Sequence, residues 1–281
     1  MTQRAATVAS LRAALASFKH DGGGGTRIAL VPTMGALHAG HVSLVREARK
    51  HAEAVVVSIF VNPAQFAPGE DFDAYPRTLD ADVEKLGGSA DIVFAPSARD
   101  MYPEGFATSI SVGGPSTGLE TDFRPHFFAG VATVVAKLLI AADPDVAVFG
   151  EKDYQQLLVV RQLARDLALG VTIIGAPTLR EADGLAMSSR NAYLEPNERK
   201  IAGRLNVILK DAAGRARGTG DLRAAEAAAT EALWNAGFSH VDYAAIRDAQ
   251  TLEHIVRLDR PARILAAVKI GKTRLIDNMV V

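Results

Sequence analysis

The feature that most constrains the fold is an alternation of short apolar runs with helical patterns along the first 178 of 281 residues. The apolar runs are rich in Val, Ile and Ala and mostly continuous, which is typical of strands buried on both faces of a parallel sheet. They lie at residues 27–32, 52–61, 90–96, 145–150 and 171–177. The helical patterns lie at residues 40–51, 78–86, 128–142 and 153–168. This alternation predicts a doubly wound α/β domain over residues 1–178.

The C-terminal part of the chain has a different pattern. Two Ala-rich helices are predicted at residues 196–216 and 221–236, and strand-like segments follow at 240–248 and 261–281. A polar loop, READGLAMSSRN, precedes these elements. Together they predict a smaller α+β domain over residues 179–281, beside the larger parallel-sheet domain.

The first 20 residues predict a short amphipathic helix, because Val8, Leu11, Leu15 and Phe18 are spaced to share one helical face. They lack the continuous apolar stretch of a signal peptide. A glycine run at residues 21–25 precedes the first strand, whereas the glycines of a dinucleotide-binding loop follow a strand and open a helix. We therefore interpret this run as a flexible connection.

Composition excludes several classes of protein. The formal net charge is -1, so the sequence gives no electrostatic case for a nucleic-acid partner. There is no cysteine, which excludes disulfides and thiolate metal ligands and fits a cytoplasmic protein. No apolar run reaches about 18 residues, so no membrane span is expected.

The stretch TMGALHAGH, which follows the first predicted strand, is the first candidate for a ligand site. Ligands of open α/β sheets bind outside the carboxyl ends of the strands, and a helix N-terminus there attracts phosphate. Gly35 and Gly40 permit a close backbone approach, and His38 and His41 are spaced to share one helix face. A pair of ordinary surface histidines or a metal-binding pair would show the same spacing, although no third metal ligand is evident nearby. The order of strand, glycines and helix favours nucleotide chemistry.

Two further strand ends carry polar side chains. Asn62 and Gln65 offer neutral amides that could hold a carboxylate or hydroxyl substrate, although Asn-Pro is also an ordinary turn signal. Lys152 could meet a phosphate beside Gly150, or could form a solvated pair with Asp153 at a helix start. Gln155 and Gln156 follow on that helix, and adjacent helical positions point in different directions.

The polar loop between the two predicted domains is the last candidate. Ser188 and Ser189 stand next to Arg190, and two hydroxyls with a guanidinium suit phosphate oxygens. A loop whose serines only cap a helix would show the same sequence. The position between two domains suggests a mobile flap.

Five ordered stretches resemble the pantoate–β-alanine ligase family, which belongs to the nucleotidylyl transferases with an H-x-G-H element. They are PTMGALHAGH, SIFVNPAQF, YPRTLDAD, VFGEKDYQQL and READGLAMSSRN, which together cover most of residues 30–195. The resemblance implies a Rossmann-like nucleotidyltransferase domain with a smaller C-terminal domain, and usually a homodimer. It also implies a two-step reaction, in which ATP and pantoate form pantoyl adenylate with magnesium. The amine of β-alanine then attacks the acyl carbon, giving pantothenate and AMP.

The resemblance also implies roles for individual residues. ATP contacts are expected from Met34, Gly35, Ala36, Leu37, His38, Ala39, Gly40, His41, Gly150, Glu151, Lys152, Asp153, Leu179, Met187, Ser188, Ser189 and Arg190. Within this set, catalytic work is expected of His41, as proton donor, and of His38, Lys152, Ser188, Ser189 and Arg190. Substrate contacts are expected from Gln65, Gln156, Asn62 and Arg124. Asp82 matches an acidic position near magnesium.

One departure from the family pattern lies in the segment RPHFFAGV, which starts at Arg124. The family commonly has a histidine where this chain has Phe127, and His126 stands one position earlier. Such a shift directs His126 elsewhere if the backbone register is kept.

Two other functions compete with the ligase. A different nucleotidylyl transferase would join a nucleotide to a phosphate acceptor, and that acceptor would call for more Lys or Arg than two glutamines provide. A nucleotide-binding regulatory module without turnover would keep the ATP motifs, but it would have little need for Gln65 and Gln156.

Overall fold

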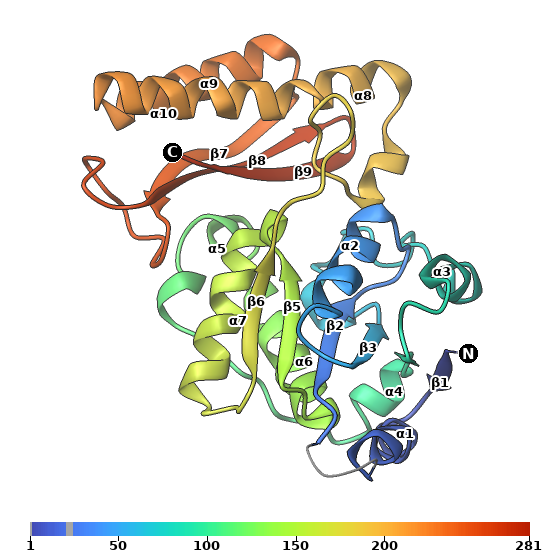
Figure 1. Cartoon of the computed structure of the whole chain (residues 1–281). Coiled ribbons are helices and arrows are strands. Elements are labelled where there is room, and N and C mark those ends of the chain that lie inside the picture. The colour runs from blue at the N-terminus through green and yellow to red at the C-terminus, as the bar shows by residue number, and fades with distance from the viewer. Residues whose placement is uncertain (1, 21–24) are drawn as a thin grey trace.

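The computed structural model describes residues 2–20 and 25–281, and of Lys19 and His20 it describes the backbone. Within these residues the chain forms a six-stranded parallel sheet with helices on both faces and a separate three-stranded antiparallel sheet (Figure 1). The predicted α/β fold class with a smaller C-terminal α+β part is therefore confirmed. Of the flexible connection predicted at residues 21–25, residues 21–24 lie outside the described residues.

The parallel sheet has the strand order β1-β4-β3-β2-β5-β6. Its strands are β1 (Gln3–Ala5), β2 (Ile28–Thr33), β3 (Ala54–Ile59), β4 (Ile92–Phe94), β5 (Val146–Gly150) and β6 (Thr172–Ala176). Sequence reasoning missed β1, because three residues with the polar side chains of Gln3 and Arg4 carry no strand signal. Its pairing with Ile92–Phe94 in β4 makes it an edge strand.

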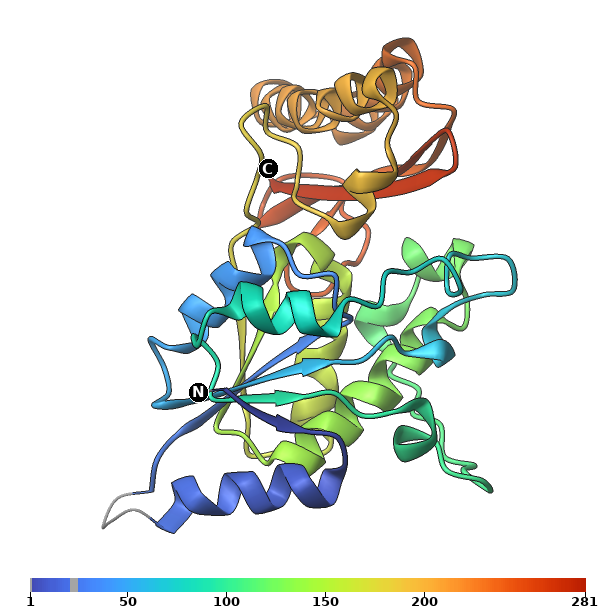
Figure 2. The same cartoon turned by 90° about the vertical axis from the view of Figure 1, so that its right-hand side faces the viewer.

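Two sets of helices cover the two faces of this sheet (Figure 2). The first set packs on the face of Ile28 and Leu30, and the second packs on the face of Ala29 and Val31. The first comprises α1 (Val8–His20), α4 (Ala98–Met101), α6 (Phe127–Ala142) and α7 (Tyr154–Asp166). The second comprises α2 (Ala39–Ala48) and α3 (Leu79–Leu86). Burial of successive residues on opposite faces explains why the strand runs are continuously apolar.

The site of the fold's topological switch lies between β2 and β5. From β2 the sheet continues through β3 and β4, and from β5 it continues to β6 in the opposite direction. Register pairs Ala29 with Val146 and Leu30 with Ala147, so the ends of β2 and β5 lie side by side. Ligands of such sheets bind in the crevice at this point.

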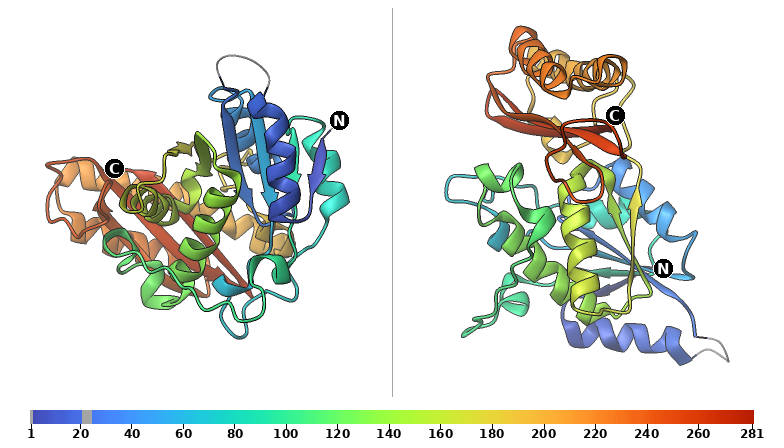
Figure 3. Two further views of the ribbon diagram at one scale, coloured as in Figure 1. Left: turned by 90° about the horizontal axis from the view of Figure 1, so that it is seen from below. Right: turned by 90° about the vertical axis from the view of Figure 1, so that its left-hand side faces the viewer.

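The C-terminal unit lies over the carboxyl edge of the parallel sheet (Figures 1 and 3). Its antiparallel sheet consists of β7 (His240–Asp248), β8 (Ala262–Ile270) and β9 (Thr273–Val280). The helices α8 (Pro196–Ala202), α9 (Arg204–Thr219) and α10 (Leu222–Ala236) belong to the same unit. The predicted helix at 196–216 is therefore two helices that meet at Gly203. A Cβ there would lie 2.5 Å from Asp183 Oδ2, so a larger residue would displace the Asp183 side chain.

Short elements connect the larger ones. They are the helices α5 (Glu120–Phe123), η1 (Pro63–Gln65), η2 (Gly114–Ser116), η3 (Glu151–Asp153) and η4 (Ser189–Tyr193). Three of them carry the candidate site residues: η1 ends at Gln65, η3 contains Lys152, and η4 contains Arg190. The helices η1 and η3 follow the ends of β3 and β5, and η4 lies between β6 and α8.

Candidate active site

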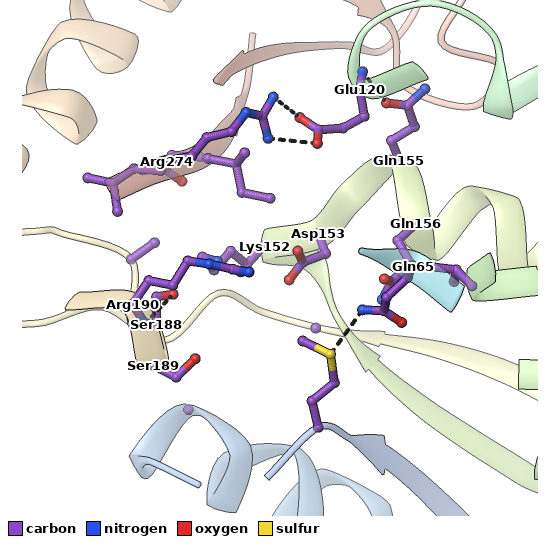
Figure 4. A pocket seen from close by; sticks show the side chains of 18 of the residues that line it. Gln65, Glu120, Lys152, Asp153, Gln155, Gln156, Ser188, Ser189, Arg190 and Arg274 are labelled. Atoms are coloured by element: carbon purple, nitrogen blue, oxygen red, sulfur yellow. Dashed lines mark hydrogen bonds and ion pairs between the residues drawn. The ribbon is translucent and has the colours of Figure 1, made fainter. Parts of the chain in front are cut away.

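A cavity of about 640 Å³ lies between the carboxyl edge of the parallel sheet and the C-terminal unit. Its walls come from both units, and Figure 4 shows polar side chains of the two entering it from different sides. The predicted residues that line it are Met34, His38, Gly40, His41, Asn62, Gln65, Arg124, Gly150, Lys152, Asp153, Gln156, Leu179, Met187, Ser188, Ser189 and Arg190. The five ordered stretches, distant in sequence, thus meet at one place except for the part around Asp82.

The two histidines of the first stretch form the N-terminal cap of α2. His38 Nδ1 accepts a hydrogen bond from the backbone N–H of Gly40 at 3.1 Å. His41 Nδ1 accepts one from the backbone N–H of His38 at 3.3 Å, and the two ring centroids are 4.1 Å apart. A Cβ on Gly40 would lie 2.8 Å from the His38 ring, so this cap requires glycine at that position.

Both imidazoles are neutral at pH 7. Burial lowers the pKa of His41 to about 3, with further lowering by His38, Lys152 and Lys85. Burial also lowers the pKa of His38 to about 4, again helped by Lys152 and Lys85. Because each Nδ1 accepts a backbone hydrogen bond, the proton of each neutral ring stands on Nε2. The site therefore presents two neutral N–H donors beside a lysine ammonium.

The loop that joins β2 to α2 is braced by α3. Gly35 and Ala36 both have positive φ, +85° and +49°, which is strained for alanine. The Asp82 carboxylate accepts hydrogen bonds from the backbone N–H groups of Ala36 and Leu37, at 3.0 and 2.7 Å. Lys85 donates to the carbonyl of Leu37. These contacts hold the loop in the conformation that brings His38 and His41 together.

Asp82 therefore does not fit the predicted role of magnesium ligand. It is 1% exposed, does not line the cavity, and has both oxygens engaged by backbone donors and by the hydroxyl of Thr78. Among the described residues, no group of three His, Cys, Asp or Glu side chains could hold a metal ion. The Asp82 carboxylate is buried against the loop rather than exposed on a helix face.

Gln65 is held by a chain of side-chain hydrogen bonds. The hydroxyl of Tyr102 donates to Asn62 Oδ1 at 2.6 Å, and Asn62 Nδ2 donates to Gln65 Oε1 at 3.1 Å and to the carbonyl of Gly130 at 3.1 Å. Burial raises the pKa of Tyr102 to about 12, so its hydroxyl keeps the proton that it donates. Gln65 Nε2 then faces the Met34 sulfur at 2.9 Å, the contact drawn as a dashed line in Figure 4. The amide nitrogen is the part of Gln65 that faces the cavity.

Asn62 was predicted as a substrate contact, but its amide is satisfied inside the protein. It is 1% exposed, and its oxygen also accepts from the backbone N–H of Ala64. It orients Gln65. The contact with Gly130 depends on close packing, because a Cβ there would lie 2.3 Å from the carbonyl oxygen of Ala64.

Arg124 lines the cavity, but its guanidinium is paired with the Glu70 carboxylate. It binds the Glu70 carboxylate with two hydrogen bonds of 2.7 Å, and it donates to the carbonyl of Gln65 at 3.1 Å. Its guanidinium carbon lies 3.9 Å from the centre of the Phe127 ring. Phe127, the departure from the family pattern, thus stacks on Arg124, whereas His126 is exposed and does not line the cavity.

The two adjacent glutamines that follow β5 have different surroundings. Gln155 is 3% exposed, accepts from the backbone N–H of Glu120 at 3.1 Å and donates to the carbonyls of Pro115 and Gly118. Gln156 lines the cavity, near Gln65 in Figure 4. In the described part of the chain, the Lys152 ammonium has no hydrogen-bonded or ion-paired protein partner, which suits it to an anionic ligand.

The flap residues are tied to the loop that follows η1. Arg190 binds Asp71 through two hydrogen bonds, of 3.0 and 2.8 Å, and Ser189 Oγ lies 3.1 Å from the Tyr75 hydroxyl. Burial opposes the charge of Arg190, but the Asp71 carboxylate outweighs it, so the pKa of Arg190 lies above its ordinary value. Ser188 Oγ accepts from the backbone N–H of Arg190, as a capping serine would.

Five residues of the predicted ATP set do not line the cavity: Gly35, Ala36, Leu37, Ala39 and Glu151. The first four shape the loop and the first turn of α2, and their side chains are absent or small except for that of Leu37, which is buried in the core. The Glu151 carboxylate lies 3.4 Å from Arg263 instead. The resemblance implies ATP contacts for continuous stretches of sequence. In the fold, only some residues of each stretch face the cavity.

Sequence reasoning missed several polar residues of the cavity. Glu70 and Asp71 pair with Arg124 and Arg190, and Tyr75 meets Ser189. They lie in a loop between Phe66 and Thr78 that has no apolar periodicity, and adjacent acidic residues in such a loop were the available signal. Arg274 of β9 binds Glu120 of α5 with hydrogen bonds of 2.7 and 2.8 Å, and nothing in the local pattern predicts this contact between the two units (Figure 4).

None of the described helices is long and apolar enough to cross a membrane.

Comparison with known proteins agrees with this geometry. Residues 3–280 match the family described as pantoate-beta-alanine ligase. The pantothenate synthetase of Mesorhizobium japonicum is 61% identical over 275 residues, which cover 97% of this chain and 95% of that protein. The crystal structure of pantothenate synthetase from Thermus thermophilus superimposes with a TM-score of 0.91 and 45% identity, covering 99% of each chain.

A second solved structure carries ligands in its description. It is the pantoate-beta-alanine ligase of Francisella tularensis, complexed with beta-gamma ATP and beta-alanine, with a TM-score of 0.82 and 34% identity. The match covers 100% of this chain and 98% of that one. The family match over almost the whole length, together with these relatives, shows that the chain belongs to the pantoate–β-alanine ligase family.

Proposed function

We propose that this chain joins pantoate to β-alanine at the expense of ATP, and that the cavity between its two units is where both steps take place. The observation that carries the proposal is the meeting of His38, His41, Lys152 and Gln65 in one cavity at the topological switch. Membership of the family favours this activity over the two alternatives, a transferase to a phosphate acceptor and a regulatory module without turnover. With all three substrates present, the expected products are pantothenate, AMP and pyrophosphate in equal amounts. Release of ADP and phosphate would contradict the proposal.

In the first step a carboxylate oxygen of pantoate attacks the α-phosphorus of ATP, and pyrophosphate leaves. Negative charge grows on the phosphorus oxygens, so fixed donors directed at them lower the barrier. Lys152, the Nε2–H groups of His38 and His41, and the hydroxyls of the flap are the donors that face the cavity. Asp153 repels phosphate and instead suits the hydroxyl groups of the ribose.

His41 acts in this proposal as a hydrogen-bond donor. With its pKa lowered to about 3, it holds no second proton at pH 7 that could be transferred. The neutral Nε2–H can still donate to a phosphate oxygen, and an anion bound there would raise the pKa of the ring. The same reasoning applies to His38, whose pKa is lowered to about 4.

In the second step the amine of β-alanine attacks the acyl carbon of the adenylate, and AMP leaves. Gln65 and Gln156 are placed to hold the hydroxyl and carboxylate groups of the small acids, because neutral amides bind such groups without adding charge. The Tyr102–Asn62–Gln65 chain fixes which end of the Gln65 amide faces the ligand. A ligand oxygen would replace the sulfur of Met34 as acceptor.

Magnesium enters this proposal with ATP. Mg²⁺ usually keeps several waters and binds substrate phosphates with one or two carboxylates, so it needs no cage made only of protein. When bound, it would neutralise phosphate charge. The contacts of Asp82 with the loop do not support it as a ligand, and the use of magnesium stays a prediction from the sequence. The homodimer, the cytoplasmic location and the absence of a nucleic-acid partner stay predictions from the sequence, as does the domain boundary at 178/179.

Replacement of Gln65 by alanine is expected to raise the KM for pantoate more than the KM for ATP. The variant loses the oriented Gln65 amide that is proposed to bind pantoate, while Lys152 and the other phosphate donors stay in place. Steady-state kinetics with each substrate varied in turn measures both constants. Gln162→Ala, on the exposed side of α7, is a matched control and should change neither. A larger rise in the KM for ATP would reject the substrate assignment.

A further inference from the structure

We infer that Asn278 and Arg263, two residues of the C-terminal sheet, position Lys152 for catalysis. The inference rests on the proposed function, in which the Lys152 ammonium donates to the phosphate oxygens of ATP. Asn278 lies in the segment TRLIDN of β9, and no role follows for it from the reaction as described so far. It belongs to the C-terminal unit, whereas Lys152 follows β5 of the parallel sheet.

Asn278 binds the backbone carbonyls on both sides of Lys152. Its Nδ2 donates to the carbonyl of Glu151 at 2.9 Å and to the carbonyl of Lys152 at 2.8 Å. The residue is 3% exposed, so water does not compete freely for these bonds. Two carbonyls of η3 thus receive their hydrogen bonds from the other unit of the protein, and the backbone that carries Lys152 is fixed by them.

Arg263 decides which way the Asn278 amide points. The guanidinium can only donate, and Arg263 Nη1 donates to Asn278 Oδ1. The amide oxygen must therefore face Arg263, and both amide protons are left for the carbonyls of η3. A rotated amide would set its oxygen against two carbonyl oxygens and its protons against a cation.

Arg263 is itself anchored on the segment that contains Lys152. Its guanidinium carbon lies 3.9 Å from the centre of the Tyr154 ring, and its Nη2 lies 3.4 Å from Glu151 Oε2. Its Nε is buried without a hydrogen-bond partner, which indicates that the side chain is placed for these contacts at a cost. The neighbouring Asp277 binds Arg180 with two hydrogen bonds and accepts from the backbone N–H of Asn278, which holds β9 at this place.

The consequence is a coupling between docking of the C-terminal unit and the phosphate end of the cavity. Lys152 lowers the pKa of both His38 and His41, so the three groups lie within reach of one another's charge. A shift of η3 would move the ammonium relative to these rings. Because displacement of a catalytic group by about 1 Å can cost about 10²-fold in rate, the two bonds from Asn278 are expected to matter for kcat.

Asn278→Asp is the sharpest test, because it keeps the shape and still accepts from Arg263 while it removes both donors. The expected result is a fall of about 10–100-fold in kcat for pantoate-dependent ATP–pyrophosphate exchange, similar to the loss of other residues that orient a reactive group. The KM for pantoate should stay within about twofold, since the Gln65 end is untouched. Asn235→Asp, on an exposed position of α10, is the matched control and should behave like the unaltered chain.

A double-mutant cycle with Lys152→Ala separates positioning from a purely structural effect. If Asn278 acts through Lys152, the double variant should be no more than about twofold slower than Lys152→Ala alone. A further 10–100-fold loss in the double variant would overturn the inference, as would unchanged kcat in Asn278→Asp. If Asn278→Asp unfolds in a thermal melt, Arg263→Gln replaces it in the cycle with the same expected non-additivity. Should Lys152→Ala itself leave exchange unchanged, the proposed function fails at Lys152, which is a distinct result.

Discussion

Replacement of His41 by alanine is expected to slow pantoate-dependent ATP–pyrophosphate exchange by about 10²-fold or more. The variant removes a buried Nε2–H donor that faces the cavity, and fixed donors for developing charge contribute on this scale. A contribution from the helix dipole alone would be about 0.3–1 kcal/mol, which corresponds to less than tenfold. The size of the loss in exchange rate therefore distinguishes a directed hydrogen-bond donor from the field of the helix dipole.

The control for this variant is the histidine that follows α2. His51 follows the end of α2, pairs with Glu47 and does not line the cavity, so His51→Ala should leave exchange nearly unchanged. Near-normal turnover in His41→Ala would make His41 a bystander. Because His41 Nδ1 also accepts from the backbone N–H of His38, a thermal melt of the variant is needed to show that the loop remains folded.

Replacement of Lys152 by alanine is expected to cost about 10²–10³-fold in the same exchange rate. Its ammonium lines the cavity and has no ion-paired or hydrogen-bonded partner in the described part of the chain, so it is available to a phosphate. Burial is the main cause of the lowered pKa of His38 and His41, and the charge of Lys152 lowers both pKa values further. Loss of this charge should therefore raise the pKa of His38 and His41, which a titration by nuclear magnetic resonance would detect.

The matched control is Lys210→Ala, at an exposed position of α9 that does not line the cavity. It removes one lysine from the surface and should leave both the exchange rate and the histidine pKa values unchanged. A similar loss of rate in both variants would contradict a specific role for Lys152. Full activity of Lys152→Ala would do so as well.

The larger features of the fold could be predicted from the sequence for a physical reason. Strands buried on both faces are apolar at nearly every position, and the runs around Leu30, Val56 and Val148 show this without any alternation. The ends of such strands then place the ligand site. Edge strand β1 escaped prediction because one short ladder with β4 holds it.

The parts of the site that could not be predicted depend on contacts between distant segments. Asp82 has the residue type of a magnesium ligand, yet from helix α3 its carboxylate binds the backbone of Ala36 and Leu37. Asn62 has the residue type of a substrate contact, yet it orients Gln65. Asn278 lies in β9, a strand of mixed polar and apolar residues, and nothing in that segment predicts its bonds to the carbonyls of Glu151 and Lys152.

The exchange reaction itself tests the central claim most directly. Labelled pyrophosphate is incubated with the chain, ATP and magnesium, with or without pantoate and in the absence of β-alanine. A ligase that forms pantoyl adenylate should return label to ATP only when pantoate is present. Label returned to ATP at the same rate without pantoate, or no return in its presence, would contradict the account.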